Sequence, residues 1–201
     1  MGFDFKVGRG VLIPRDDTEV VVNLCIDFLK NRTDKKTVDL CSGSGAIAVA
    51  LDKISGAEVT AVEIDETAFT YLETNVKENN SSVKPVMADA LKICDTFADG
   101  ELDLIVSNPP YIKSADIETL QKEVRLEPRL ALDGGEDGYN FYREIVSRWS
   151  RKLKKGGALA FELGEGQADA VKALMTDKGF SDFKISLDFG GVQRAIIGTL
   201  L

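Results

Sequence analysis

The sequence contains no histidine and only three cysteines. Without an imidazole, the chain cannot use a Ser-His-Asp triad, a Cys-His acyl-transfer pair or a histidine-containing zinc site. Cys25, Cys41 and Cys94 are widely spaced and never form a C-x-x-C pair, which argues against a disulfide framework or a thiolate metal cage. We therefore expect no bound metal, and a protein of the reducing cytoplasm.

Long apolar runs and excess positive charge are also missing. The longest clean apolar stretch, Ala46 to Leu51, is far shorter than the roughly 18 residues that cross a membrane. Asp4 interrupts the N-terminus before the apolar part of a secretion signal develops. Lys and Arg total 25 against 33 Asp and Glu, a net charge of −8. We therefore expect neither membrane association nor stable nucleic-acid binding.

The remaining composition is that of one ordinary globular domain. Hydrophobic residues make up 44% of the 201 residues and charged residues 29%, a length and composition typical of about one domain. Phe3, Phe5 and Val7 alternate with polar residues before a glycine-containing turn at residues 8–10. This pattern predicts a short β-hairpin lead-in over residues 1–15, followed by a single domain over residues 16–201.

Strand and helix patterns alternate along that domain. The expected strands cover residues 37–40, 58–64, 84–87, 102–107, 158–163, 183–187 and 194–199. The expected helices carry apolar stripes within residues 16–28, 47–54, 68–76, 142–153 and 171–175, the first with capping-box spacing at Asp16 and Glu19. The alternation predicts an α/β fold with a mostly parallel, Rossmann-like sheet, and ligands at the carboxyl ends of its strands. The short Gly190-Gly191 link predicts an antiparallel final strand pair.

A glycine turn lies between the first strand and the helix that follows it. Gly43 and Gly45 permit close approach of the main chain, and the helix N-terminus presents free N–H groups to a polar ligand. Glu63 ends the next strand, near the roughly 20-residue spacing of a carboxylate that binds ribose hydroxyls. These features indicate a nucleotide-like cofactor, with both a nicotinamide cofactor and S-adenosylmethionine open at this point.

The Asn-Pro-Pro-Tyr segment follows the strand expected at residues 102–107. It decides between a nicotinamide cofactor and S-adenosylmethionine. The Asn108 side chain and the Pro109 carbonyl can accept both hydrogens of a planar NH2 group, and Tyr111 offers a flat face. Paired prolines hold these acceptors rigidly. We interpret the segment as a site for an amide or for the amino group of a base. By contrast, Tyr142, Trp149 and Phe141 lie at helical spacing and are expected in the core.

Four segments resemble the HemK/PrmC family of peptide chain release factor glutamine methyltransferases. They are residues 11–19 (VLIPRDDTE), 39–48 (DLCSGSGAIA), 107–112 (SNPPYI) and 127–135 (EPRLALDGG). The resemblance implies a seven-stranded methyltransferase sheet with an antiparallel C-terminal strand. It also implies S-adenosylmethionine as cofactor, and N5 methylation of the glutamine in the Gly-Gly-Gln loop of a release factor. In this reaction the amide nitrogen attacks the sulfonium methyl group directly.

The resemblance also implies roles for individual residues. The loop on the methionine side of the cofactor would comprise Cys41, Ser42, Gly43, Ser44 and Gly45, with Glu63 at the ribose and Asp89 and Ala90 beside the adenine. The glutamine would be held by Asn108, Pro109, Pro110 and Tyr111; Asn108 would also border the cofactor, and Asn108, Pro109 and Tyr111 would carry the catalysis. Two residues depart from the family pattern, since Cys41 stands where glycine is common and Glu63 where aspartate is common.

A further departure lies at the N-terminus. Bacterial members of the family usually carry a helical domain that contacts the release factor, whereas only a short lead-in precedes the segment at residues 11–19. The chain is therefore expected to be a piece of a longer protein, or a short form that works with a small partner subunit.

Other functions remain open from the sequence. The Asn-Pro-Pro-Tyr segment also occurs in adenine-N6 methyltransferases of DNA or RNA, and a ribosomal protein could supply the target glutamine. A nicotinamide-dependent dehydrogenase and a binding module without turnover are the remaining alternatives.

Overall fold

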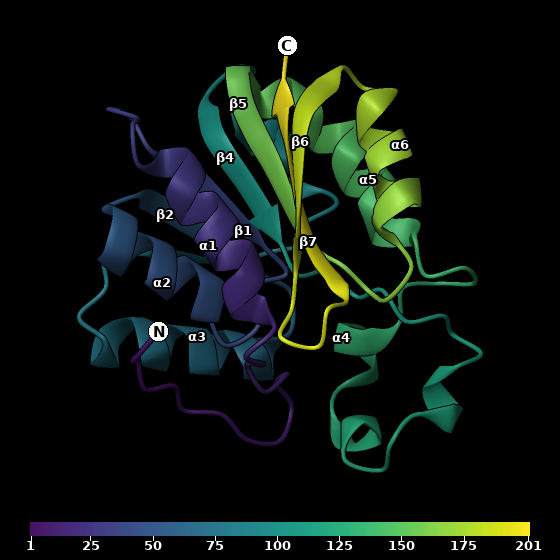
Figure 1. Cartoon of the computed structure of the whole chain (residues 1–201). Coiled ribbons are helices and arrows are strands. Elements are labelled where there is room, and N and C mark those ends of the chain that lie inside the picture. Colours follow the sequence, from purple (N-terminus) through teal and green to yellow (C-terminus); the bar gives the residue numbers. More distant parts are fainter.

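The alternating pattern folds into a seven-stranded sheet with helices on both faces in the computed structural model, which describes residues 1–201 (Figure 1). The strands are β1 (Lys36–Leu40), β2 (Glu58–Glu63), β3 (Lys84–Met87), β4 (Leu102–Ser107), β5 (Leu153–Glu162), β6 (Phe180–Leu187) and β7 (Gln193–Leu200). Their order is β3-β2-β1-β4-β5-β7-β6. The pairs among β1 to β5 are parallel, and β7 runs antiparallel to both β5 and β6. The predicted fold class and the antiparallel final pair are thus confirmed.

Two hydrophobic layers sandwich the sheet. The helices are α1 (Thr18–Leu29), α2 (Ala46–Ser55), α3 (Glu66–Glu78), α4 (Arg129–Leu132), α5 (Asn140–Trp149) and α6 (Ala168–Thr176). Leu104 and Val106 of β4 pack in one cluster with α1, α2 and α3, whereas Ile105 packs in the other with α5 and α6. Successive strand residues point to opposite faces, so one buried strand supplies both layers. No helix is long and apolar enough to cross a membrane.

The strand ends define one edge of the sheet on which the loops converge. Leu40 of β1 pairs in register with Val62 of β2 and with Ser107 of β4, which in turn pairs with Phe161 of β5. Parallel strands in register bring their carboxyl ends to the same edge. The glycine turn, the residues after β2, the Asn-Pro-Pro-Tyr segment and the loop after β5 therefore all leave the sheet side by side.

The lead-in over residues 1–15 is not the expected β-hairpin, because it contains no strand and only a turn near Gly10. Phe3 and Phe5 pack against the core cluster on the α1, α2 and α3 side, which explains their alternation without a partner strand. The main chain of Lys6 bonds instead to the side chain of Asn75 on α3. A helix side chain thus replaces the strand that the pattern predicted.

The capping box expected at the start of α1 is also absent. Asp17 occupies the N-cap position and its side chain makes no capping hydrogen bond. Glu19 pairs with the N-terminal amine of Met1 instead. Because the helix begins at Thr18, Glu19 stands at its second position and not at the third, which a capping box requires.

Asn75 is a buried polar link between the lead-in and the domain. The buried Asn75 side chain accepts a hydrogen bond from the Lys6 N–H (2.7 Å) and donates to the carbonyls of Lys6 (3.0 Å) and Ser44 (2.9 Å). A single amide therefore holds both the lead-in and the glycine turn.

Replacing Asn75 with Ala should lower the free energy of unfolding by about 2 to 3 kcal/mol, because buried polar groups lose their partners. Trypsin should also cleave faster at Lys6 and Arg9. Denaturant unfolding and timed proteolysis measure the two effects. Asn23→Ala, at an exposed position of α1, is the control; equal behaviour of the two variants would contradict the role assigned to Asn75.

Candidate active site

A cavity of about 260 Å³ opens at the carboxyl edge of the sheet. It brings together seven of the residues implied by the family resemblance: Cys41, Gly43, Glu63, Asp89, Ala90, Asn108 and Pro110. Ser42, Ser44, Gly45 and Pro109 are buried and do not line it. Tyr111 is half-buried and also lies outside the lining. The structure therefore places seven residues of the expected set on the cavity wall, and the other five next to them in the chain but outside the lining.

The apolar wall of the cavity includes residues that the sequence patterns did not single out. Val62, Ala68 and Leu91 contribute to it, as does Phe141, which was expected only in the core. The helix on which Phe141 lies does pack on the sheet, but its partly buried ring reaches the cavity as well. Aromatic and aliphatic walls of this kind suit a planar ring system.

The lead-in and the segment at residues 127–135 form two further walls of the cavity. Residues 10–12 line the cavity from the lead-in, and Pro128, Leu130 and Ala131 line it from the segment at residues 127–135. Residues 11 and 12, Pro128, Leu130 and Ala131 belong to two of the four segments that carry the family resemblance, at residues 11–19 and 127–135. Their place at the cavity follows only from the fold.

The first glycine of the glycine turn, Gly43, faces open space. Gly43 has φ +54, and a Cβ placed on it would meet no atom within 4 Å. The turn is fixed from behind, since the Ser42 hydroxyl donates to the Asp39 carbonyl (2.8 Å) and the Gly45 N–H donates to the Ser42 carbonyl (2.8 Å). The first turn of α2 carries no side-chain cap, so its N–H groups stay available to a ligand.

Glu63 connects the glycine turn to the end of β2. Its Oε2 accepts a hydrogen bond from the Gly43 N–H (2.8 Å), and its Oε1 accepts from the N–H groups of Ile64 (2.8 Å) and Asp65 (2.9 Å). A carboxylate offers about four acceptor sites, so capacity remains for a donor from the cavity. The longer side chain at this position is therefore compatible with a ribose contact.

Cys41 adopts the conformation that explains why glycine is common at its position. Its φ is +60, in the left-handed region, which costs a non-glycine residue roughly 1–2 kcal/mol. Burial, reinforced by the charge of Glu63, raises the pKa of the thiol. A neutral thiol is a poor nucleophile, and the left-handed conformation of Cys41 shapes the loop.

Asp39 is a buried carboxyl group that the sequence patterns did not identify as a site residue. It lies in the middle of the sheet within β1, and neither side-chain oxygen has a hydrogen-bond partner. Burial raises the pKa of Asp39 from its ordinary value of 3.8 to about 8. A charged residue type inside the buried run of β1 was the available signal.

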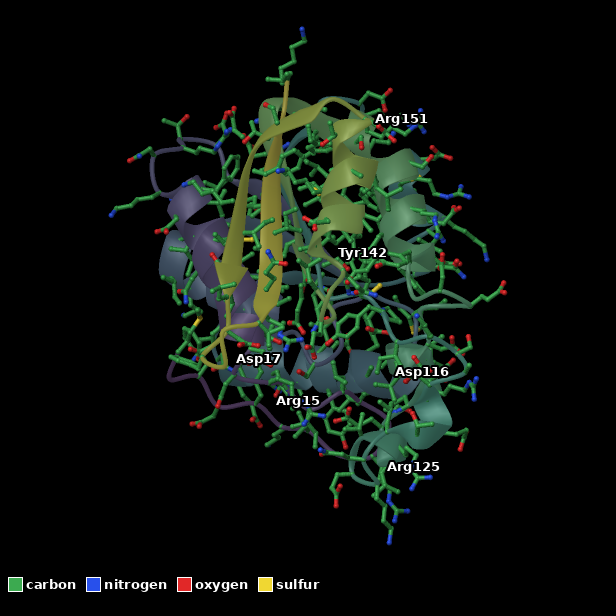
Figure 2. All side chains as sticks on the ribbon, turned by 45° about the vertical axis from the view of Figure 1, so that its right-hand side comes forward. Arg15, Asp17, Asp116, Arg125, Tyr142 and Arg151 are labelled. Atoms are coloured by element: carbon green, nitrogen blue, oxygen red, sulfur yellow. The ribbon has the colours of Figure 1, made fainter.

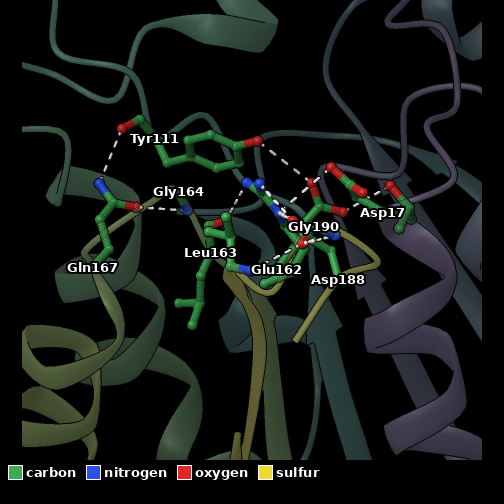
Figure 3. Close-up of polar contacts among 11 residues, drawn as sticks. Asp17, Tyr111, Glu162, Leu163, Gly164, Gln167, Asp188 and Gly190 are labelled. Atoms are coloured by element: carbon green, nitrogen blue, oxygen red, sulfur yellow. Dashed lines mark hydrogen bonds and ion pairs between the residues drawn. The ribbon is translucent and has the colours of Figure 1, made fainter. Parts of the chain in front are cut away.

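The Asn108 side chain is free to receive a ligand, whereas Tyr111 is held by the protein. Asn108 is half-buried, lines the cavity and makes no hydrogen bond within the chain. The Tyr111 hydroxyl lies 3.5 Å from Oε1 of Glu162, the last residue of β5 (Figure 3). Burial, followed by the charge of Glu162, raises the pKa of Tyr111. The phenol therefore stays protonated and can donate.

The segment after the Asn-Pro-Pro-Tyr loop returns to brace it. The Ile112 N–H donates to the Leu132 carbonyl (2.9 Å), and the Gly134 N–H donates to the Ile112 carbonyl (2.7 Å). A Cβ on Gly134 would lie 2.7 Å from Cα of Tyr111, a distance that only glycine permits. Between these contacts the segment projects beyond the sheet, with the exposed Arg125 at its outer end (Figure 2).

The segment at residues 11–19 joins this brace through an ion pair. The Arg15 guanidinium contacts Glu127 Oε1 at 2.7 Å. Arg15 is exposed on one side, but the Glu127 side chain is almost fully buried. The pair links two of the segments that carried the family resemblance, and it does so beside the cavity.

Comparison with known proteins agrees with this fold. A family model described as the methyltransferase small domain matches residues 15–127. Among solved structures, a methyltransferase from Pyrococcus furiosus superposes with a TM-score of 0.71 at 22% identity over 98% of this chain and 89% of that one. The catalytic domain of hMettl16, solved with the MAT2A 3'UTR hairpin 1, gives a TM-score of 0.79 at 15% identity over 100% of this chain and 75% of that one. The family match and the fold thus define a methyltransferase domain.

Relatives in sequence narrow this class. The release factor glutamine methyltransferase of Geobacter sulfurreducens is 42% identical over 99% of this chain, which covers 69% of that relative. The enzyme of the same name from Clostridium acetobutylicum is 36% identical over 98% of the chain and 70% of the relative. The chain belongs to the release factor glutamine methyltransferase family.

The raised pKa of Asp39 predicts how stability changes with pH. The folded chain keeps this proton at pH values where the unfolded chain has released it. The stability that Asp39 contributes is therefore full below pH 3.8 and is lost as the pH rises towards 8. Asn at this position does not titrate.

Relative to wild type, Asp39→Asn should gain stability by up to about 1.4 kcal/mol per pH unit between about pH 5 and 7. Denaturant unfolding at several pH values measures this difference. Other buried acids, Glu162 among them, titrate in both proteins, so their contributions cancel in the stability difference. Parallel stability profiles for the two proteins would contradict a protonated Asp39.

Proposed function

We propose that the protein transfers a methyl group from S-adenosylmethionine to the side-chain amide nitrogen of the glutamine in the Gly-Gly-Gln loop of a peptide chain release factor. The observation that carries this proposal is the placement of Glu63 and Asn108 on one cavity, in a chain of the release factor glutamine methyltransferase family. The first residue is an acceptor suited to a ribose, and the second is an unoccupied acceptor suited to an amide.

The cavity residues fit the cofactor. The space above Gly43 admits a ligand beside the N-terminus of α2, and the Glu63 carboxylate retains acceptor capacity. Ala90, Leu91 and Phe141 provide an apolar wall for the adenine, and Asp89 lies next to it with its Oδ1 already bonded to the Leu91 N–H (2.9 Å). When bound, S-adenosylmethionine supplies an electrophilic methyl group.

The contribution of the protein is to orient the glutamine and to increase the electron density on its nitrogen. Amide nitrogens are weak nucleophiles because the lone pair is delocalised into the carbonyl. Hydrogen bonds from the NH2 group to the Asn108 side chain and the Pro109 carbonyl increase that density and fix the direction of approach. Tyr111 packs against the amide, and the proton finally leaves to water, since the sequence offers no histidine as a base.

The proposal extends to the surroundings of the enzyme. Residues 16–201 form the methyltransferase domain, and the protein substrate is a release factor in the cytoplasm. The net charge of −8 argues against a stable complex with nucleic acid.

The decisive test is a methylation assay with purified release factors, analysed by mass spectrometry of the Gly-Gly-Gln peptide. The expected product carries one additional methyl group on the glutamine. Parallel reactions contain an adenine-containing DNA, an RNA and ribosomal proteins. Methylation of one of these substrates in place of the release factor would contradict the proposal.

Glu63→Ala should weaken the binding of S-adenosylmethionine by about 1.5 to 3 kcal/mol for each charge-assisted hydrogen bond lost. Titration calorimetry measures the affinity, and Glu63→Gln separates loss of charge from loss of the side chain. Glu66→Ala, at an exposed position in the first turn of α3, is the control and should bind normally. Normal binding by Glu63→Ala would remove Glu63 from the cofactor site.

Asn108→Ala should lower kcat on the release factor by about 100-fold or more, the scale of losing one preorganised polar contact. The substrate NH2 group loses an acceptor and can rotate away from the methyl group. Initial rates of methyl transfer give kcat, and Asn108→Asp tests whether any acceptor suffices. A wild-type rate for Asn108→Ala would show that the loop does not hold the glutamine.

A further inference from the structure

We propose that Glu162 and Gln167 are positioning residues for methyl transfer, because they fix Tyr111 and thereby the direction in which Asn108 and Pro109 face the substrate. We call Thr18, Tyr142, Glu162 and Gln167 the Tyr111 clamp. All four residues are buried, with exposed fractions of 8%, 0%, 2% and 8%. The inference rests on the proposed function, since it concerns how the amide acceptor is held.

Gln167 holds the main chain of Tyr111. Its Nε2 donates to the Tyr111 carbonyl (3.1 Å) and to the Gly138 carbonyl (3.4 Å). Its Oε1 accepts from the Gly164 N–H (2.9 Å) and lies 3.1 Å from the Tyr142 hydroxyl. The residue stands at the N-cap of α6 yet makes no capping bond there. The amide is therefore committed to the loop rather than to its own helix (Figure 3).

Glu162 holds the side chain of Tyr111. Its Oε2 accepts a hydrogen bond from the Thr18 hydroxyl (2.7 Å), which fixes the carboxyl group, and its Oε1 faces the Tyr111 hydroxyl at 3.5 Å. Arg194, whose charge lowers the pKa of Glu162, bonds to Asp188 at 2.9 Å and approaches Asp17 at 3.5 Å. Burial raises the pKa of Glu162 to about 7. Glu162 is thus a buried acceptor whose hydrogen-bond donors are two hydroxyl groups.

The clamp acts on Asn108 through the prolines. Only Pro109 and Pro110 separate Asn108 from Tyr111, and a proline ring fixes φ near −65°. The Asn108 side chain itself has no hydrogen bond to the protein, so its direction depends on the main chain of the loop. Fixing Tyr111 at its carbonyl and at its hydroxyl therefore limits the tilt of the whole loop.

A purely structural role for the clamp makes different predictions from a positioning role. Loss of buried hydrogen bonds lowers stability in both cases. Misplaced acceptors lower kcat, whereas the glycine turn and Glu63 do not contact the clamp, so the affinity for S-adenosylmethionine should fall much less than kcat. Asp103 provides the matched control, since it is a buried carboxylate at the start of β4, bonded to Lys154 at 2.9 Å, on the edge of the sheet away from the cavity.

The experiment compares Glu162→Ala, Gln167→Ala, Glu162→Gln and Asp103→Asn with wild type, below the melting temperature of each protein. Glu162→Ala and Gln167→Ala should lower kcat on the release factor by about 10- to 100-fold, the scale of a small misplacement of reacting groups. Glu162→Gln keeps an acceptor for Tyr111 and should retain most activity. Asp103→Asn should keep the wild-type kcat.

A double-mutant cycle tests whether Glu162 acts through Tyr111. Tyr111→Phe removes the hydroxyl and keeps the ring, so its effect and that of Glu162→Ala should overlap, leaving the double variant no slower than the slower single variant. Multiplicative effects would overturn the proposed link. A wild-type kcat in both Ala variants, or a lowered kcat in Asp103→Asn as well, would overturn the positioning role.

Hydrogen exchange provides a readout that does not need turnover. The amides of residues 111–112 should exchange faster in Glu162→Ala and Gln167→Ala, and at the wild-type rate in Asp103→Asn. Wild-type exchange in the Ala variants would overturn the clamp. A wild-type enzyme that binds S-adenosylmethionine but leaves release factors unmodified would instead contradict the proposed function, and the exchange data would still decide whether the clamp holds the loop.

Discussion

The contact between Gly134 and the main chain of Tyr111 is the constraint on which the site depends. The chain leaves β4 as a short proline-rich loop that cannot pair with a neighbouring strand. It is held because the segment at residues 127–135 returns and bonds to Ile112 on both sides. A side chain at Gly134 would push the two segments apart, and the loop would lose its brace. Arg15 and Glu127 then tie this brace to the start of the domain.

Buried carboxyl groups near the sheet edge differ in how many hydrogen-bond donors the protein offers them. Glu63 receives three main-chain N–H groups, Glu162 has two hydroxyl donors, and Asp39 has no partner. Burial therefore raises the pKa of Glu162 to about 7 and that of Asp39 to about 8. The same chemical group, a carboxyl, is thus held by main-chain N–H groups at Glu63, faces two hydroxyl groups at Glu162, and is buried without a partner at Asp39.

The lead-in contributes to the site although it has no regular secondary structure. Asn75 fixes its main chain at Lys6 and fixes the glycine turn at Ser44, so residues 10–12 are placed on one wall of the cavity. Segments far apart in sequence therefore depend on one amide side chain. A change in the lead-in should therefore alter the position of the glycine turn.

The sequence by itself determined the order along the chain of the seven strands and of five helices, because apolar runs and helical periodicity are local properties. The short α4 (Arg129–Leu132) lies in a stretch where no helix was expected. The expected ranges of β3 and β4 agree with the structure residue for residue. The motifs also indicated the Asn-Pro-Pro-Tyr loop and Glu63, since their residue types carry the chemistry. Only the tertiary structure decided that the lead-in lies on α3 instead of forming a hairpin, that Phe141 reaches the cavity, and that Glu162 and Gln167 converge on Tyr111. Each of these placements depends on contacts between segments that are distant in sequence. Such contacts are determined by tertiary packing and not by the local sequence pattern.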